Sequence, residues 1–217
     1  MILPHDVRLV ATNPSYSVLS DFDSGWITHT FNILLYVEGD KEVVAGRLLV
    51  YKLNVGNVIR QKRSLFDAFD CFSQETYNCY VTIFDDNEDV RKAFQDERCG
   101  QYDALINDFH LLSVLEIDEA FKGNYLTGTV LQIYLENFAN GSDVAYLKAF
   151  PLQHSAANSA PYKRMFKGGL KACEAKLCEY YQSLGFRRIR KRSDFFFVVD
   201  DFLDKWKKVK AELAIDD

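Results

Sequence analysis

The stretch HLLSVLEIDEAFKGNYLTGTV (His110–Val130) decides the fold that this sequence predicts. It opens with an apolar run, His110–Ile117, that indicates a strand, and it continues through Phe121–Asn124 into a segment expected to be helical. A second apolar strand, 144–150, follows at the separation typical of a β-α-β unit, and the next helix ends in YYQSLGF (Tyr180–Phe186). Backbone N–H groups at the start of a helix favour an anion, so this order of elements indicates a site for an anionic cofactor.

Further strands and helices are predicted around this unit. Alternating apolar and polar residues predict a hairpin of strands 31–37 and 43–53 around the turn EGDK (38–41). Between residues 64 and 84, apolar residues recur at intervals of three and four residues, which predicts amphipathic helices with Ser64 and Ser73 as N-caps. The remaining expectations are a short helix through Phe94, a strand at about 103–117 with a bulge or break at Asn107 and Asp108, a helix over 170–184, a hairpin of 186–189 with 195–199, and a terminal helix over 202–213.

These elements together predict an α/β (α+β) fold. We expect a mixed, largely antiparallel central sheet flanked by helices, with a helical insertion at about 64–98. A chain of 217 residues buries about 70% of its unfolded surface, so a single domain over 1–217 is expected. Its composition is 48% apolar, 14% aromatic and 26% charged, which excludes a disordered or coiled-coil chain.

Cysteine usage and charge predict a reduced, cytoplasmic protein. The five cysteines are odd in number and scattered, and they form no CxxC pair. The sequence contains neither a secretory leader pattern nor an apolar run of membrane-spanning length, so we expect no membrane association. A formal net charge of −5 argues against a globally electrostatic nucleic-acid binder, although it leaves room for a local basic patch.

The order of strand, turn, helix, strand, helix and Tyr-x-x-x-Gly-Phe resembles the GCN5-related N-acetyltransferase (GNAT) family. The resemblance covers 103–199 and, more loosely, the hairpin at 31–53. It implies transfer of an acetyl group from acetyl-CoA, as co-substrate, to a primary amine by direct attack in a ternary complex. It further implies that the strands at 110–117 and 144–150 splay apart, with the pantetheine arm of the cofactor between them.

The resemblance places the pyrophosphate of acetyl-CoA in the turn before the helix. The implied cofactor-binding residues are Leu115, Ile117, Lys122, Gly123, Asn124, Tyr125, Leu126, Thr127 and Gly128. Gly123 allows close backbone approach, and Lys122 supplies a cation where the family pattern has Gln or Arg. Tyr125 and Thr127 stand where that pattern has small residues, so an ordinary strand-helix connection, or a domain that has lost acyl-CoA binding, remains an alternative.

The implied catalytic residues are Tyr181, Glu116 and Asp118. Tyr181 lies four residues before Gly185, where the family often keeps a tyrosine that protonates the departing thiolate. A phenol with a pKa near 10 suits that role, since it is protonated at neutral pH. Glu116 and Asp118 are candidate bases, because an ammonium group must lose a proton before it attacks. The alternatives are that Tyr181 packs the helix onto the sheet and that both carboxylates are solvated or capping groups.

Other polar residues have weaker assignments. His154 could reach an acceptor, whereas His5, His29 and His110 have no carboxylate or cysteine at metal-ligand spacing, so no metal is predicted. The backbone N–H groups of Leu115 and Ile117 could polarise the thioester carbonyl. Basic residues before the helix at 170 could reach the CoA 3′-phosphate; they are Lys163, Arg164, Lys167 and Lys171.

A second basic group, at 187–192 in the last hairpin, gives the main alternative function. It contains five cations in six residues and most such runs are solvated, but it could hold RNA or an acidic partner in a catalytically inactive domain of the same fold. For the acetyltransferase the acceptor is a small-molecule or protein amine, and a homodimer is possible. The helical insertion and the loop 153–160 are the segments expected to choose that acceptor.

Overall fold

The computed structural model describes residues 7–12, 15–16, 25–37, 41–89, 91, 108–122, 126–139, 143–149, 169–184, 186–188 and 195–198. The chain falls into two compact units, Met1–Ala145 and Tyr146–Asp217. The single domain expected over the whole chain stays a prediction. Among the described residues no helix is both long enough and apolar enough to cross a bilayer.

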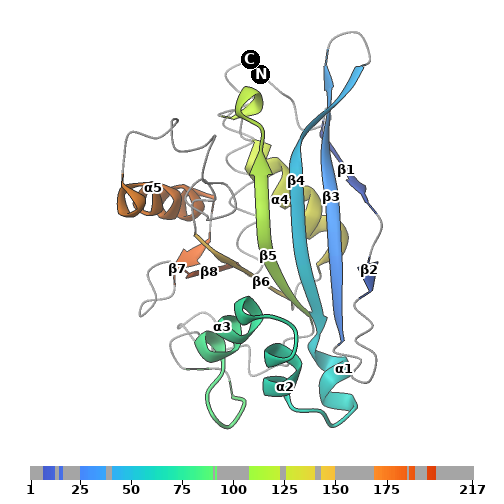
Figure 1. The fold of residues 1–217 in the computed structure, drawn as a ribbon, viewed down its shortest axis with the longest axis vertical. Coiled ribbons are helices and arrows are strands. Elements are labelled where there is room, and N and C mark those ends of the chain that lie inside the picture. Colours follow the sequence, from blue (N-terminus) through green and yellow to red (C-terminus); the bar gives the residue numbers. More distant parts are fainter. Residues whose placement is uncertain are drawn as a thin grey trace. The chain divides into compact units, whose positions relative to one another are not determined.

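The first unit is built on an antiparallel sheet (Figure 1). Its strands are β1 (Val7–Ala11), β2 (Ser15–Tyr16), β3 (Trp26–Val37), β4 (Lys41–Asn54) and β5 (Asp108–Ile117). The long strand β3 pairs with β1, β2 and β4, and β4 pairs in turn with β5. The predicted hairpin is therefore confirmed, and so is the predicted class, a mixed α/β fold with a mostly antiparallel sheet. Both β1 and β2 lie in a region for which the sequence analysis predicted no strand.

The pairing of β4 with β5 changes register in the middle of the strands. Leu49 lies opposite Val114 and Val50 lies opposite Leu112, so Ser113 is an extra residue on β5. This is the arrangement of a β-bulge, which bends a strand and leaves one residue outside the regular ladder. The irregularity predicted at Asn107 and Asp108 is placed differently, because Asp108 pairs regularly with Asn54 and Asn107 lies outside the described residues.

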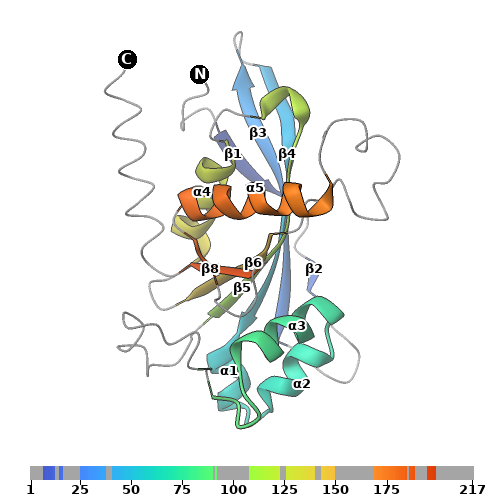
Figure 2. The same ribbon diagram turned by 90° about the vertical axis from the view of Figure 1, so that its left-hand side faces the viewer.

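Three short helices follow β4 and lie together at one end of the long strands (Figure 2). They are α1 (Val55–Arg60), α2 (Leu65–Asp70) and α3 (Gln74–Ile83). The two predicted N-caps are confirmed, since Ser64 Oγ accepts from the Asp67 backbone and Ser73 Oγ accepts from the Thr76 backbone. Helical structure begins at Val55, before the expected start of the insertion, and the predicted helix through Phe94 lies largely outside the described residues.

Aromatic side chains attach helices to both faces of the sheet. On one face Trp26 stacks on Phe72, and its indole Nε1 donates to the Ala68 carbonyl over 2.6 Å. On the other face α4 (Leu126–Phe138) packs against β3, where Phe31 meets Tyr134 and Phe138 at ring-centroid distances of 5.8 and 5.2 Å. Because side chains alternate along a strand, each face of β4 and β5 contacts a different set of helices.

The second unit contains the remaining described elements. The strand β6 (Val144–Lys148) crosses the boundary between the units, and α5 (Leu170–Ser183) matches the helix predicted over 170–184. The strands β7 (Arg187–Arg188) and β8 (Phe195–Val198) pair antiparallel, which confirms the last predicted hairpin. The loop 153–160, most of the basic run 187–192 and the terminal helix over 202–213 lie outside the described residues.

Gly46 should be required for the close approach of β4 to β5. A Cβ atom added there would lie 2.0 Å from the backbone oxygen of Glu116, so Gly46→Ala forces the two strands apart. We expect the free energy of unfolding, measured by urea denaturation, to fall by about 2–3 kcal/mol. Gly56→Ala is the matched control, because the nearest atom to its Cβ is 3.8 Å away and alanine favours the helix. Equal stability of the two variants would contradict this account.

Candidate functional site

The strand-turn-helix order predicted for the cofactor turn is present in the first unit. Leu115 and Ile117 are half-buried on β5 and pair with Leu48 and Gly46. The strand is followed by a 3₁₀ turn, η2 (Glu119–Phe121), and α4 begins at Leu126. Gly123, Asn124 and Tyr125 lie outside the described residues, so the shape of the turn itself is a prediction only.

The described ends of that turn have defined surroundings. Lys122 is exposed, and its ammonium forms an ion pair with Glu119 over 2.5 Å. Thr127 is half-buried in the first turn of α4, while Leu126 and Gly128 are buried there. Leu126 and Gly128 therefore contribute to the packing of α4.

The two candidate bases differ in their surroundings. Glu116 Oε2 lies 2.8 Å from Arg47 Nε in a salt bridge, and its side chain is 22% exposed. Asp118 is exposed, and its backbone N–H donates to the Ala45 carbonyl over 2.8 Å. Glu116 is thus already the partner of a guanidinium group, which leaves Asp118 as the more accessible of the two carboxylates.

Tyr181 lies in the last turn of α5, in the second unit. Its ring packs on Phe186 at 5.6 Å, and its backbone carbonyl accepts from the Phe186 N–H over 3.0 Å. Burial of the phenol raises the pKa of Tyr181, and the neighbouring Tyr180 and Cys178 raise it further. The hydroxyl is therefore protonated at neutral pH, as a proton donor must be. Its packing also agrees with the alternative that this residue is structural.

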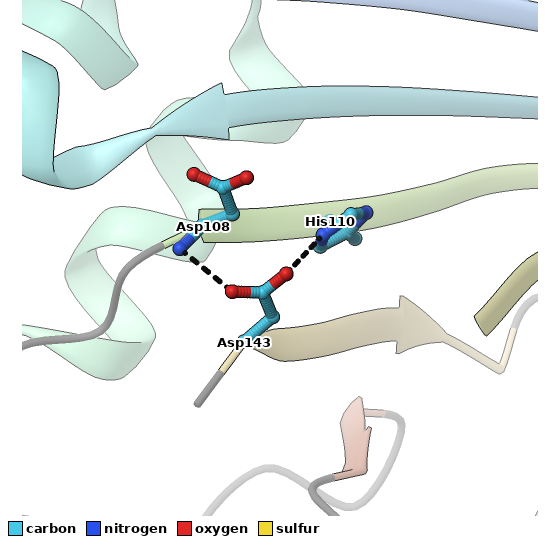
Figure 3. A group of neighbouring side chains, drawn as sticks. All are labelled: Asp108, His110 and Asp143. Atoms are coloured by element: carbon cyan, nitrogen blue, oxygen red, sulfur yellow. Dashed lines mark hydrogen bonds and ion pairs between the residues drawn. The ribbon is translucent and has the colours of Figure 1, made fainter. Parts of the chain in front are cut away.

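A buried polar network, which sequence analysis did not predict, lies between β5 and the start of β6 (Figure 3). His110 Nε2 lies 3.2 Å from Asp143 Oδ2, and the side chains of the pair are 0% and 1% exposed. Asp143 Oδ1 accepts from the backbone N–H of Asp108 over 3.2 Å. The carboxylate of Asp108 points away from Asp143 and towards β4.

Residues of β4 and α4 complete this network. The Lys52 ammonium lies 2.7 Å from Asp108 Oδ2 and donates to the Phe138 carbonyl over 3.1 Å. On the other side of His110, its Nδ1 lies 2.9 Å from the hydroxyl of Tyr134. Burial, together with Asp143 and Asp108, raises the pKa of Tyr134, so this phenol is neutral. The network joins β4, β5, α4 and the residue before β6 through charged groups that are largely shielded from water.

Three members of the network have the donor atoms of a metal site. The ligand atoms of Asp108, His110 and Asp143 lie within 4.8 Å of one another. Their hydrogen-bonding capacity is nevertheless engaged within the protein, and the Lys52 ammonium already supplies a positive charge to Asp108. We therefore interpret the cluster as an internal ion-pair and hydrogen-bond network. The expected absence of a metal stays a prediction.

A sequence signal for this network did exist. Asp108 and His110 are two apart on a strand, so their side chains share a face, and Lys52 is the register partner of His110. Asp143 directly precedes the second predicted strand, and only the tertiary structure brings it to His110. The fold thus supplies the carboxylate partner of His110, which is Asp143.

A second polar cluster lies on the opposite face of β4 and β5. Ser113 Oγ, at the bulge of β5, donates to Glu75 Oε2 of α3 over 2.7 Å. Tyr51 of β4 lies beside this pair, with its ring 4.9 Å from Phe72. Burial raises the pKa of Tyr51 and the charge of Glu75 raises it further, whereas a hydrogen bond with Ser113 opposes the shift. All four side chains are half-buried.

Comparisons with known proteins leave the function to be argued from this geometry. The chain matches no protein-family model, no curated protein and no solved structure. The family resemblance therefore rests on the residues and the order of elements described above.

Lys52 should be essential to the stability of the first unit. Lys52→Met leaves the carboxylate of Asp108, which is 10% exposed, without its ammonium partner. Breaking a buried ion pair is costly, so we expect urea denaturation to show a loss of about 3 kcal/mol. The double variant Lys52→Met/Asp108→Asn should recover part of that loss. Arg8→Met is the control, since its ion pair with Glu42 is exposed and an exposed ion pair contributes little to stability.

His29 should make the protein less stable in mild acid. Burial lowers the pKa of His29, and Lys52 and His110 lower it further. Below a pH of about 6.5 the unfolded chain binds a proton that the folded state does not, so stability falls as the pH falls. His29→Leu should therefore lose less unfolding free energy than the wild type between about pH 7 and pH 5, measured by urea denaturation at each pH. An identical loss would show that His29 does not contribute.

Proposed function

We propose that this protein is an N-acetyltransferase that moves an acetyl group from acetyl-CoA to a primary amine. The observation that carries the proposal is the bulge at Ser113 in β5, the strand that leads through a short turn into the amino end of α4. A bulge disturbs the regular ladder and is over-represented next to active sites. A main-chain N–H outside the regular ladder would suit a thioester carbonyl, on which negative charge develops during acyl transfer.

The amino end of α4 supports the cofactor half of the proposal. This helix has 13 residues, and its first N–H groups have no carbonyl acceptors within the helix. A pyrophosphate accepts such groups, and the positive end of the helix dipole favours it. Gly123 and Lys122 keep their proposed roles of close backbone approach and positive charge.

The proposed reaction is a direct displacement. The free amine nitrogen attacks the thioester carbonyl carbon, a C–N bond forms, and the C–S bond breaks. The CoA thiolate takes a proton from the Tyr181 phenol, which regains it from solvent. The substrate ammonium loses one proton to the base before attack, and its nitrogen loses a second as the amide forms. Both pass to solvent, so one proton is released per turnover. Asp118 is the better of the two proposed bases, because Arg47 engages Glu116.

A catalytically inactive binding domain is the second candidate, favoured by specific observations. Glu116 and Lys122 are each held in an ion pair, with Arg47 and Glu119 respectively. Groups held in this way have structural roles that need no ligand. Such a domain could use the basic run 187–192, of which Arg188 is exposed. Binding of RNA or an acidic partner that weakens steeply as the salt concentration rises would favour this candidate.

Calorimetric titration with acetyl-CoA tests the proposed function directly. We expect a dissociation constant in the low micromolar range. The absence of any heat of binding at millimolar acetyl-CoA would contradict the proposal. Tyr181→Phe should keep this affinity but lower turnover by about tenfold or more, because the thiolate loses its proton donor. Turnover is measured as thiol release with a polyamine, an amino acid ester and a lysine peptide as acceptors. Unchanged turnover would remove the acid role from Tyr181.

A further inference from the structure

The ring of His29, on β3, lies against the last residue of α4. Its centroid is 5.6 Å from that of Phe138 and 6.0 Å from that of Phe31. Its Nδ1 atom is buried and has no hydrogen-bond partner among the described residues. Protonation would make both ring nitrogens donors, so the structure would then hold a buried N–H without an acceptor. The neutral ring is therefore the form that fits this contact.

The carboxyl end of α4 is held to the sheet at Phe138. The last carbonyl groups of a helix have no N–H partner within it, and the Phe138 carbonyl accepts from the Lys52 ammonium over 3.1 Å. The ammonium also suits the negative end of the helix dipole. The ring of Phe138 packs on Phe31 at 5.2 Å and stacks on Tyr134 at 5.3 Å. His29 thus contacts the residue through which this helix end is tethered.

The carboxylates around this contact have other partners. On the elements packed against this face of the sheet, the charged and titratable groups are Lys52 of β4, Asp108 and His110 of β5, Asp143 before β6, and Tyr134 and Glu136 of α4. Asp108 pairs with Lys52, and Asp143 pairs with His110. Glu136 is exposed and accepts from the Gln132 amide.

The surroundings of His29 oppose a positive charge on its ring. His29 pairs with Val50, and Lys52 lies two residues further along β4, so the side chains of His29 and Lys52 are diagonal neighbours on one face. Burial is the larger cause that lowers the pKa of His29, and Lys52 and His110 lower it further. A solvated histidine has a pKa of about 6.5, so this packed arrangement loses stability as the pH falls below that value.

We propose that His29 is a pH-sensitive latch for the carboxyl end of α4, which leaves the sheet when the ring takes up a proton in mild acid. Separation of His29 from Phe138 exposes the ring, so water can solvate both its charge and its second N–H. The same movement breaks the bond between Lys52 and the Phe138 carbonyl. This inference does not depend on the acetyltransferase function, because the proposed cofactor turn lies at the opposite end of α4.

Hydrogen exchange followed by NMR tests the latch on the full chain. The protection factors of the Asn137, Phe138 and Ala139 amides are compared at about pH 7.5 and about pH 5.5, after correction for the intrinsic exchange rates. A solvated imidazole is protonated about ten to one at the lower pH, so we expect protection to fall by about fivefold to tenfold. Unchanged protection of these three amides would overturn the proposal.

Urea distinguishes the opening of one helix end from unfolding of the whole unit. A local opening exposes little surface, so exchange at Phe138 and Ala139 should be insensitive to urea below about 1 M. Amides of β4 that exchange through global unfolding should respond to the same urea. An equally steep response at Phe138 and in β4 would show that acid unfolds the unit as a whole, and the latch would be wrong.

Two variants locate the titrating group. His29→Leu keeps the apolar contact with Phe138 but cannot take up a proton, so it should lose the pH dependence of exchange at the end of α4. His29→Gln is also neutral and provides the same test if the leucine variant does not fold. Glu136→Gln is the matched control, because it removes a titratable group from the exposed side of the same helix, and it should respond as the wild type does. Persistence of the fall in both His29 variants would overturn the proposal.

Discussion

The register between β4 and β5 is the constraint on which the first unit depends. It sets Lys52 opposite His110 and Tyr51 opposite Leu111, so adjacent residues of β4 serve opposite faces of the sheet. Lys52 enters the buried network beneath α4, whereas Tyr51 enters the cluster that contains Ser113 and the inserted helices. A slip of one residue in this register would exchange the two faces and place charged side chains among apolar ones.

The two polar clusters have different physical characters. The side chains of His110 and Asp143 are almost completely shielded from water. Their network includes side chains from β4 and from α4, and Asp143 itself directly precedes β6. Such a network specifies one arrangement of elements, because an unpaired member would carry the full cost of desolvation. Around Glu75 the side chains are only half-buried and lie at a bulge. That difference is why we assign a stabilising role to the first cluster.

Local sequence rules predicted most of the described elements. The hairpin of β3 and β4, the N-caps Ser64 and Ser73, and the helix α5 follow from alternation, capping and apolar periodicity, which act over a few residues. The same rules did not predict β1 or β2, which are short strands near the start of the chain. They also placed the irregularity of β5 at two polar residues, although Asp108 is paired and held by Lys52.

The sequence by itself determined the class of fold and the order of its elements, because periodicity and capping are properties of neighbouring residues. Only the tertiary structure decided that Asp143 meets His110, that Glu75 meets Ser113, and that Arg47 engages Glu116. Each of these pairs joins residues far apart in the chain, and the partner is chosen by strand register and by the packing of helices onto the sheet. A carboxylate in the printed sequence can therefore be recognised as polar, but whether it is a base, an ion-pair partner or a ligand depends on what the fold sets beside it.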